Sequence, residues 1–168
     1  KRRIAALYAS FMDDETVEAR GLEPIASDLA AVATVSTPAE LLALSGRLQR
    51  QGVSGLINTG ALNDAGNPDR MLLHLLQGGL GLPDESYYRE EAQAPLRQAY
   101  VAHVARMMAL AGLTDSLGAS GEDLAERVMA METALAKGHW DRVTCRDVEK
   151  MNNPMSWQQI VDSATGLP

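Results

Sequence analysis

Side chains that could bind a metal ion or act as a nucleophile are few in this sequence of 168 residues. It contains three histidines, His74, His103 and His139, and no two of them have the i, i+4 spacing that places two imidazoles on one zinc ion. The single cysteine, Cys145, has no second cysteine with which to share a metal ion. No Gly-x-Ser-x-Gly motif of a serine hydrolase is present. We therefore expect the histidines and the cysteine to have structural roles.

A cluster of glycines in the segment QGGLGLPDESYYRE, residues 77–90, is the second place where the sequence could bind a ligand. A phosphate-binding loop presents backbone N–H groups to the ligand and leads directly into a helix. Here Pro83 has no N–H group, Asp84 would repel a phosphate, and no Lys or Arg lies inside the loop. We therefore expect a turn from a strand to a helix, with a positive φ at Gly81 and with Asp84 or Ser86 as the helix cap.

The charge balance limits the classes of partner. The sequence has 22 Asp and Glu against 15 Lys and Arg, which gives a net charge of −7. This excess of negative charge argues against binding to nucleic acid, which needs clustered cations. No apolar run approaches the roughly 18 residues that a membrane span needs. We therefore expect neither a nucleic-acid partner nor a membrane span in these residues.

The pattern of apolar residues predicts a mainly α fold, a bundle-like arrangement of several helices in a single domain of residues 1–168. Thr37-Pro38-Ala39-Glu40 combines the signals of a helix start, because threonine caps, proline suits the first turn and glutamate bonds back. Pro95 and Ser120 are expected to begin two longer helices. The expected buried face comprises Leu96, Tyr100, His103, Met107 and Leu110 in the first of these, and Leu124, Val128, Met131 and Leu135 in the second.

Residues 53–77 break the helical period. Two short apolar runs there are separated by Asn63-Asp64-Ala65-Gly66-Asn67-Pro68, which is typical turn chemistry. We predict one β-hairpin with strands at about 54–61 and 70–77. A short helix at 70–76 is the competing interpretation, because the apolar residues there come in pairs and do not alternate.

The start of the sequence lacks the signals of a natural helix start. An amphipathic pattern begins at once, yet no capping residue precedes it and Lys1, Arg2 and Arg3 lie at the end of the helix dipole that disfavours cations. We therefore expect these residues to be a piece of a longer chain.

Five segments occur here in an order that resembles the N-terminal half of the neprilysin-like zinc metallopeptidases, and that looks most similar to the actinobacterial members and to bacterial oligopeptidases of that family. The segments are LYASFMDDETVEARGLEPI, QGGLGLPDESYYRE, AYVAHVARMMALAG, METALAKGHW and RDVEKMNNPMSWQQI. The residues that carry the resemblance most specifically are Gly81, Pro83, Asp84, Tyr87, Tyr88, Arg146, Asp147, Asn153 and Pro154. One departure is Asn152, where members of the family usually have a tyrosine.

The resemblance implies a parent protein of two lobes that uses zinc to cleave oligopeptides. The family's His-Glu-x-x-His helix, its further glutamate ligand and its Asn-Ala-Tyr/Phe-Tyr substrate strand do not occur in this sequence. No catalytic, metal or substrate residue is therefore assigned here, and we expect these residues alone to be inactive. The resemblance implies that they form the helical lobe, which encloses the catalytic chamber and limits substrate size. Its partners would be the catalytic lobe of the same chain and peptide substrates.

Two further expectations follow from the resemblance. The parent would be a soluble bacterial protein, either secreted or associated with the cell envelope, with the cytoplasm as the alternative. An exposed apolar surface is expected where the catalytic lobe would pack. The competing function is a catalytically inert helical module that binds a partner protein through its Met- and Leu-rich faces.

Overall fold

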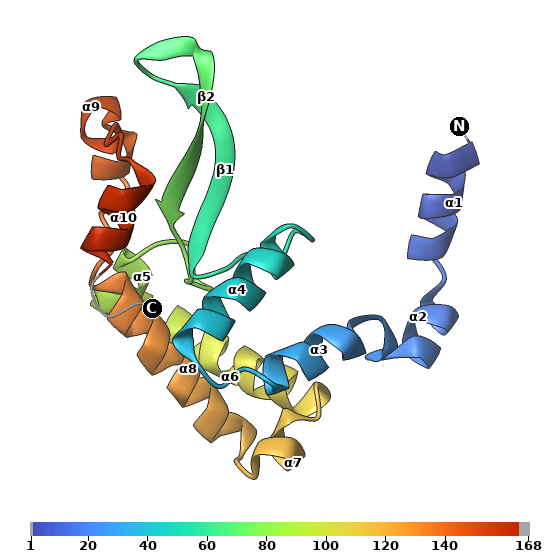
Figure 1. The fold of residues 1–168 in the computed structure, drawn as a ribbon. Coiled ribbons are helices and arrows are strands. Elements are labelled where there is room, and N and C mark those ends of the chain that lie inside the picture. Colours follow the sequence, from blue (N-terminus) through green and yellow to red (C-terminus); the bar gives the residue numbers. More distant parts are fainter. Residues whose placement is uncertain (1, 165–168) are drawn as a thin grey trace. The chain divides into compact units, whose positions relative to one another are not determined.

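The computed structural model describes residues 2–164, and its architecture is mainly helical with one two-stranded antiparallel sheet (Figure 1). The predicted fold class is therefore confirmed. The chain divides into two compact units, Lys1–Leu44 and Ser45–Pro168. We describe each unit by itself.

The first unit is a series of short helices whose ends are set by local signals. It contains α1 (Arg2–Phe11), α2 (Asp14–Arg20), the 3-10 turn η1 (Glu23–Ile25) and α3 (Ala26–Ala33). The Asp13 carboxylate accepts the Thr16 N–H at 3.1 Å and caps α2, and Gly21 ends this helix with a φ of 47°. The large apolar side chains of α1 are exposed, including Ile4, Leu7 and Phe11.

Helix α4 (Pro38–Gln49) spans the boundary between the units and begins with the predicted capping motif. The Glu40 carboxylate accepts the N–H groups of Ser36 at 2.9 Å and Thr37 at 3.1 Å. The Thr37 hydroxyl in turn accepts the Glu40 N–H at 3.3 Å, so that the helix start is bonded in both directions.

The predicted β-hairpin is present, and the competing helix at 70–76 is wrong. Strand β1 (Ile57–Asp64) pairs with β2 (Asn67–Gln77), so both strands extend further toward the turn than predicted. The reason is that the Asp64 carboxylate accepts the Gly66 N–H at 2.8 Å and pairs with Arg70, which shortens the turn to two residues. The pairing is irregular between Asn63 and Asp64, and at such an irregularity a strand tolerates a proline such as Pro68.

In the second unit α6 (Ala94–Leu110) and α8 (Gly121–Ala136) pack against each other, and two of the shorter helices contact both of them. The shorter elements are α5 (Ser86–Arg89), η2 (Glu91–Gln93), α7 (Leu113–Leu117), η3 (Thr144–Arg146), α9 (Val148–Met151) and α10 (Trp157–Ser163). One buried cluster joins Leu82, Tyr88 and Ala136, and the other joins Val104, Ala105 and Ala125. The first cluster packs the glycine segment and α5 on α8, and the second packs α6 on α8.

The predicted buried faces of α6 and α8 are wrong in part. Leu96, Met107 and Leu110 of α6 are 44%, 50% and 71% exposed, and His103 is also exposed. The residues of α6 that are buried are Val104 and Ala105, because α6 is apolar on several sides and its pattern did not identify the side that meets α8.

In α8 the buried face is not the one predicted, because it includes residues one position further along the helix. Leu124 is buried as expected, but Met131 is 52% exposed, and Glu132 and Ala136 are buried instead. A charged residue inside this helix was not expected at a buried position, and its partners explain it.

Candidate functional site

Tyr88 of the glycine segment and Tyr100 of α6 meet a buried carboxylate on α8. The Tyr88 hydroxyl donates to Glu132 Oε2 at 2.6 Å, and the Tyr100 hydroxyl of α6 donates to Glu132 Oε1 at 2.9 Å. Tyr88 also accepts the Leu82 N–H at 3.0 Å, so that it holds the backbone of the glycine segment. Glu132 is 6% exposed. The cluster therefore joins α5, α6 and α8 and satisfies a carboxylate that would otherwise be costly to bury.

The electrostatics of this cluster favour protonated tyrosines. Burial, together with the hydrogen bond to the Glu132 carboxylate, raises the pKa of Tyr100 to about 12 and raises the pKa of Tyr88 as well. Both hydroxyls therefore remain hydrogen-bond donors at physiological pH. A general base would need a pKa close to the working pH, so we interpret the cluster as a structural clamp.

The glycine segment differs from the prediction at Gly81. Its φ is not positive, and the left-handed residue of the segment is Gly79, with a φ of 83°. Gly81 is needed for a different reason, which is close approach. A Cβ atom added there would overlap the Tyr100 hydroxyl and lie 2.7 Å from Tyr100 Cζ. The backbone turns at Gly79, where the chain leaves β2, and Tyr100 packs against Gly81.

The predicted helix cap at Asp84 or Ser86 is displaced, because Glu85 is the residue that precedes α5 and its side chain makes no capping hydrogen bond, while Asp84 forms a turn one residue earlier. The Asp84 carboxylate accepts the N–H of Ser86 at 3.0 Å and its hydroxyl at 2.5 Å, and Ser86 is the first residue of α5. Arg142, which follows α8 in the sequence, lies 3.5 Å from the same carboxylate. Tyr87 packs beside the buried cluster, and its carbonyl accepts from Arg97 at 2.8 Å. The residues that follow Pro83 are therefore tied to both long helices.

The base of the hairpin is fixed to the segment that follows α8. The Gln77 side-chain amide exchanges two hydrogen bonds with the Trp140 backbone, at 3.0 and 2.9 Å. His139 Nε2 lies 3.1 Å from the Gly78 carbonyl. At the same base of the hairpin, near the start of β1, the Thr59 hydroxyl donates to Gln49 Oε1 at 2.9 Å. The histidine that follows α8 is thus part of a structural junction, as expected.

The second group of motif residues, Arg146, Asp147, Asn153 and Pro154, surrounds the short helix α9 and is held by local hydrogen bonds. The Asp147 carboxylate accepts the N–H groups of Glu149 and Lys150, both at 3.2 Å, and caps α9. The Asn153 side chain donates to the Lys150 carbonyl at 2.6 Å. Arg146 ends η3, and Pro154 lies in the exposed connection to α10. Within residues 2–164, no hydrogen bond joins this motif to the Tyr88 cluster, so the structure does not bring the two motifs together into one site.

The remaining residues with potential chemistry are dispersed. His74 is half-buried on β2, His103 is exposed on α6, and Cys145 Sγ lies 3.7 Å from the Trp140 carbonyl. Among the described residues, no group of three or more His, Cys, Asp and Glu side chains could hold a metal ion. In the same part of the chain, no helix is both long and apolar enough to cross a membrane.

The sequence analysis did not predict the role of Glu132, and it expected Tyr100 to be buried without identifying its hydrogen bond to Glu132. A signal for Glu132 existed, because it lies four residues after Val128 and four before Ala136 on one face of α8. A carboxylate inside such a row requires partners, and tyrosine hydroxyls are suitable donors.

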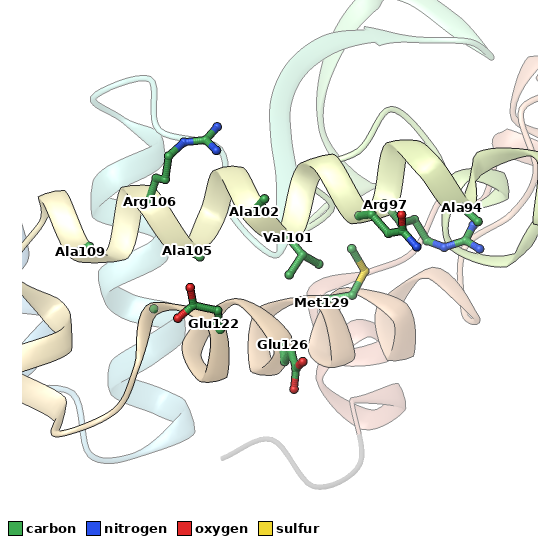
Figure 2. Close-up of a pocket in the computed structure, with 12 residues that line it drawn as sticks. Ala94, Arg97, Val101, Ala102, Ala105, Arg106, Ala109, Glu122, Glu126 and Met129 are labelled. Atoms are coloured by element: carbon green, nitrogen blue, oxygen red, sulfur yellow. The ribbon is translucent and has the colours of Figure 1, made fainter.

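A groove of about 810 Å³ runs along one side of α6 and α8 (Figure 2). Its floor consists largely of small side chains from α6, and Met129 of α8 contributes a larger apolar side chain. Arg106 lies on the α6 rim, and Glu122 and Glu126 lie on the α8 rim. No cluster of titratable groups suited to catalysis lines it, which makes it a candidate docking surface.

The sequence model of peptidase family M13 matches residues 1–168, and the chain therefore belongs to this family of neprilysin-like zinc metallopeptidases, as part of its N-terminal region. The resemblance seen in the sequence is confirmed.

Among solved structures, the chain is similar to the zinc metalloprotease Zmp1 of Mycobacterium tuberculosis. The crystal structure of Zmp1 with an inhibitor is 39% identical, has a TM-score of 0.87, and the match covers 96% of this chain and 24% of that chain. The cryo-EM structure of its open state is 39% identical and has a TM-score of 0.84, and the match covers 96% of this chain and 25% of that chain. A partially open state of the same enzyme is 38% identical and has a TM-score of 0.71. The match covers 99% of this chain and 24% of that chain. A search of curated proteins gave no match. The chain thus spans about a quarter of the length of the structures it matches.

Proposed function

We propose that this chain is part of a zinc-dependent metalloendopeptidase that cleaves oligopeptides. The observation that carries the proposal is the family match over residues 1–168, together with 39% identity to a zinc metalloprotease over 96% of the chain. In this proposal the residues form the helical lobe, which encloses the catalytic chamber and limits the size of the substrate.

The zinc ion would be bound by parts of the parent protein outside these residues. The described residues do not fit a zinc ion, because they contain no group of three potential ligands, and the sequence has no His-Glu-x-x-His motif. We therefore assign no step of peptide hydrolysis to this chain. Of the nine motif residues, Asp84, Tyr88 and Asp147 would stabilise the lobe through the turn before α5, the tyrosine clamp and the cap of α9.

The test compares the full-length protein with residues 1–168 alone. Full-length protein should contain one zinc ion by mass spectrometry, lose activity when a chelator removes it, and cleave short peptides much faster than long unfolded chains of the same local sequence. Residues 1–168 should contain no stoichiometric zinc and cleave nothing. Zinc-dependent cleavage by residues 1–168 would show that the proposed division of labour is wrong.

The alternative, a catalytically inert interaction module, is supported by the exposed apolar side chains of α1 and α6, such as Phe11 and Leu110. The two proposals differ in what the native gene encodes beyond these residues. A His-Glu-x-x-His motif downstream supports the peptidase, and a gene without one supports the interaction module.

A further inference from the structure

We propose that the free edge of strand β1 and the pocket at its base bind the C-terminal segment of an oligopeptide substrate. The segment is added to the hairpin as an antiparallel strand, and its carboxylate meets Arg50. The inference rests on the proposed function, because it takes the peptide substrate of the parent protein as the occupant. It goes beyond that function because it assigns a binding site for one end of the peptide to residues of this chain.

Strand β1 has an edge that the sheet does not use. Within residues 2–164 it pairs only with β2, so alternate backbone N–H and C=O groups on its other side have no strand partner. Proteins usually protect such an edge with charged residues or proline. Residues 53–63 contain neither, whereas the residues that follow include Asp64, Pro68 and Arg70. The edge of β1 can therefore accept a further strand.

The side chains of β1 suit an extended peptide. Ile57 and Leu62 point to opposite faces of the hairpin and are 42% and 50% exposed. A two-stranded hairpin is marginally stable in water by itself, and a third strand adds both backbone hydrogen bonds and apolar contacts with these side chains. A docked helix would leave the backbone groups of the edge unused, because its own are bonded internally. The edge therefore favours a strand as its occupant.

A pocket of about 340 Å³ lies at the base of the same strand, between β1 and the end of α4. Most of its lining is polar, and the polar side chains are those of Gln49, Arg50, Ser54, Asn58 and Thr59. Asn58 and Thr59 are consecutive in β1, so their side chains point to opposite faces of the hairpin. A pocket that both of them line lies at the edge of the strand. The free edge and the pocket are therefore continuous.

Arg50 gives the pocket a positive charge. No Asp or Glu lines the pocket, and in the described part of the chain no carboxylate forms an ion pair with Arg50. A guanidinium group binds a carboxylate through two parallel hydrogen bonds, and the Ser54 hydroxyl is a further donor. The end of α4 opposes an anion only weakly, because the Leu48 carbonyl already accepts the N–H groups of Gln51 at 2.9 Å and Val53 at 3.1 Å. The pocket therefore fits one carboxylate group.

The direction of β1 decides which end of the peptide reaches the pocket. The strand runs from Ile57 at the base of the hairpin to Asp64 at the turn, so an antiparallel partner runs toward the base and ends at the pocket. Its C-terminal carboxylate then meets Arg50, whereas a parallel partner would bring an ammonium group to the same cation. Residues 57–63 span about 20 Å, which accommodates a segment of about six residues.

The first experiment locates the bound peptide. The probe is an acetylated, uncharged six-residue peptide with photoreactive p-benzoylphenylalanine at its C-terminal position. It is added to the full-length protein after a chelator has removed zinc, so that the probe is not cleaved, and mass spectrometry maps the cross-links. We expect cross-links to residues 46–59, reduced about tenfold when the C-terminus of the probe is amidated, because the charge that Arg50 binds is then lost.

Two outcomes of this experiment would overturn the proposal. One is the absence of cross-links to residues 46–59, which is expected if another segment of the chain or a second copy of the protein covers the edge of β1. The other is equal cross-linking by the probe with a free C-terminus and by the amidated probe.

The second experiment tests the arginine. Arg50→Gln should weaken binding of a fluorescent version of the probe about tenfold, measured by anisotropy, and should leave the weaker binding of the amidated probe unchanged. Arg47 is an exposed arginine on α4 that does not line the pocket, so Arg47→Gln is the matched control and should bind as the wild type does. Both side chains are exposed, so both variants should fold. Equal losses in the two variants would contradict the assignment of Arg50.

A third experiment tests strand pairing without changing the protein. N-methylation removes one backbone N–H group from the probe. Because alternate residues of an added strand point their N–H groups toward its partner, methylation at every second residue should reduce binding, and methylation at the residues between them should have little effect. Equal effects at all positions would contradict an added strand.

Binding and cleavage are measured separately, so this inference and the proposed function can fail independently. A protein that cleaves peptides with zinc but gives no cross-link to residues 46–59 would refute the peptide site and leave the function. A protein that binds the probe through Arg50 but shows no zinc-dependent cleavage would refute the function and leave a site for peptide C-termini.

Discussion

Residues 2–44 and residues 78–140 are both largely helical, yet they are stabilised in different ways. In the first region, Leu44 is the one buried residue among those described, and Ile4, Leu7 and Phe11 are 74%, 72% and 77% exposed. The second region contains both buried clusters and the Tyr88–Glu132–Tyr100 clamp. Helix ends in the first region are set by local caps, whereas the second region is fixed by contacts between distant residues.

The difference shows which part depends on the rest of the protein. Isolated helices shorter than about 12 residues are marginal in water, even with good caps. Helices α1, α2 and α3 are all shorter than this, and their apolar side chains are not buried by the described residues. We therefore expect residues 2–44 to gain their stability from other parts of the parent chain, and residues 78–140 to hold much of theirs internally.

The largest effect is expected from Glu132→Ala. The change leaves the hydroxyls of Tyr88 and Tyr100 without their acceptor and creates a cavity, so we expect a loss of about 3 kcal/mol in the free energy of unfolding. Urea denaturation of the protein, followed by circular dichroism, measures it. Glu132→Gln is the matched control, because it keeps the shape and one acceptor oxygen and should lose roughly half as much. A loss from Glu132→Ala of less than about 1 kcal/mol would mean that the hydrogen bonds of the clamp contribute little.

Gly81→Ala tests the close approach in the same region. The added methyl group displaces Tyr100 from Glu132, and we expect a loss of about 2 kcal/mol. Combining it with Tyr100→Phe removes the hydroxyl that overlaps the methyl group, so the two losses should not add. Additive losses in this double-mutant cycle would show that Gly81 acts through something other than Tyr100.

A third test uses alkaline pH. Because the pKa of Tyr100 is raised to about 12 in the folded protein, its stabilising contribution is fully present below the unfolded pKa of about 10 and is lost as the pH rises from there toward 12. We expect Tyr100→Phe to reduce the fall in unfolding free energy across this window by about 1 kcal/mol per pH unit, less than the full 1.4 because the ring is partly exposed. Urea midpoints at pH 9, 10 and 11 for both proteins measure this. Parallel pH profiles would contradict the raised pKa.

The same comparison shows how far the sequence predicts the structure. Caps and turns depend on neighbouring residues, so the start of α4 at Thr37-Pro38 and the hairpin around Asn63–Pro68 were predicted correctly. The buried side of α6 was not, because its polar and apolar residues are distributed over all sides and give no single apolar face. The role of Gly81 was also misassigned, since its partner Tyr100 is distant in sequence and a clash with it leaves no local signal.

In the candidate site, too, features that depend on neighbouring residues were predicted and contacts between distant residues were not. The family motif was recognisable in the sequence from Gly81 to Tyr88, and the position of Asp84 just before a helix was predicted, although its carboxylate forms a turn with Ser86 and not the helix cap. The clamp was not predicted, because it needs the register of α5 against α8, which places Tyr88 beside a carboxylate 44 positions away.

The smallest effect is expected from Phe11→Ala in residues 1–168 alone. The informative result is the difference between this effect and the effect of the same substitution in the full-length protein. In residues 1–168 alone, Phe11 is 77% exposed, so its removal should change the free energy of unfolding by no more than about 0.5 kcal/mol. In the full-length protein the same change should destabilise by about 3 kcal/mol, provided that α1 is buried there by other parts of the chain. Ser10→Ala, at a neighbouring exposed position, is the control and should be near neutral in both. A small effect of Phe11→Ala in the full-length protein would mean that α1 remains uncovered, and the contrast between the two regions would then hold in the full-length protein as well.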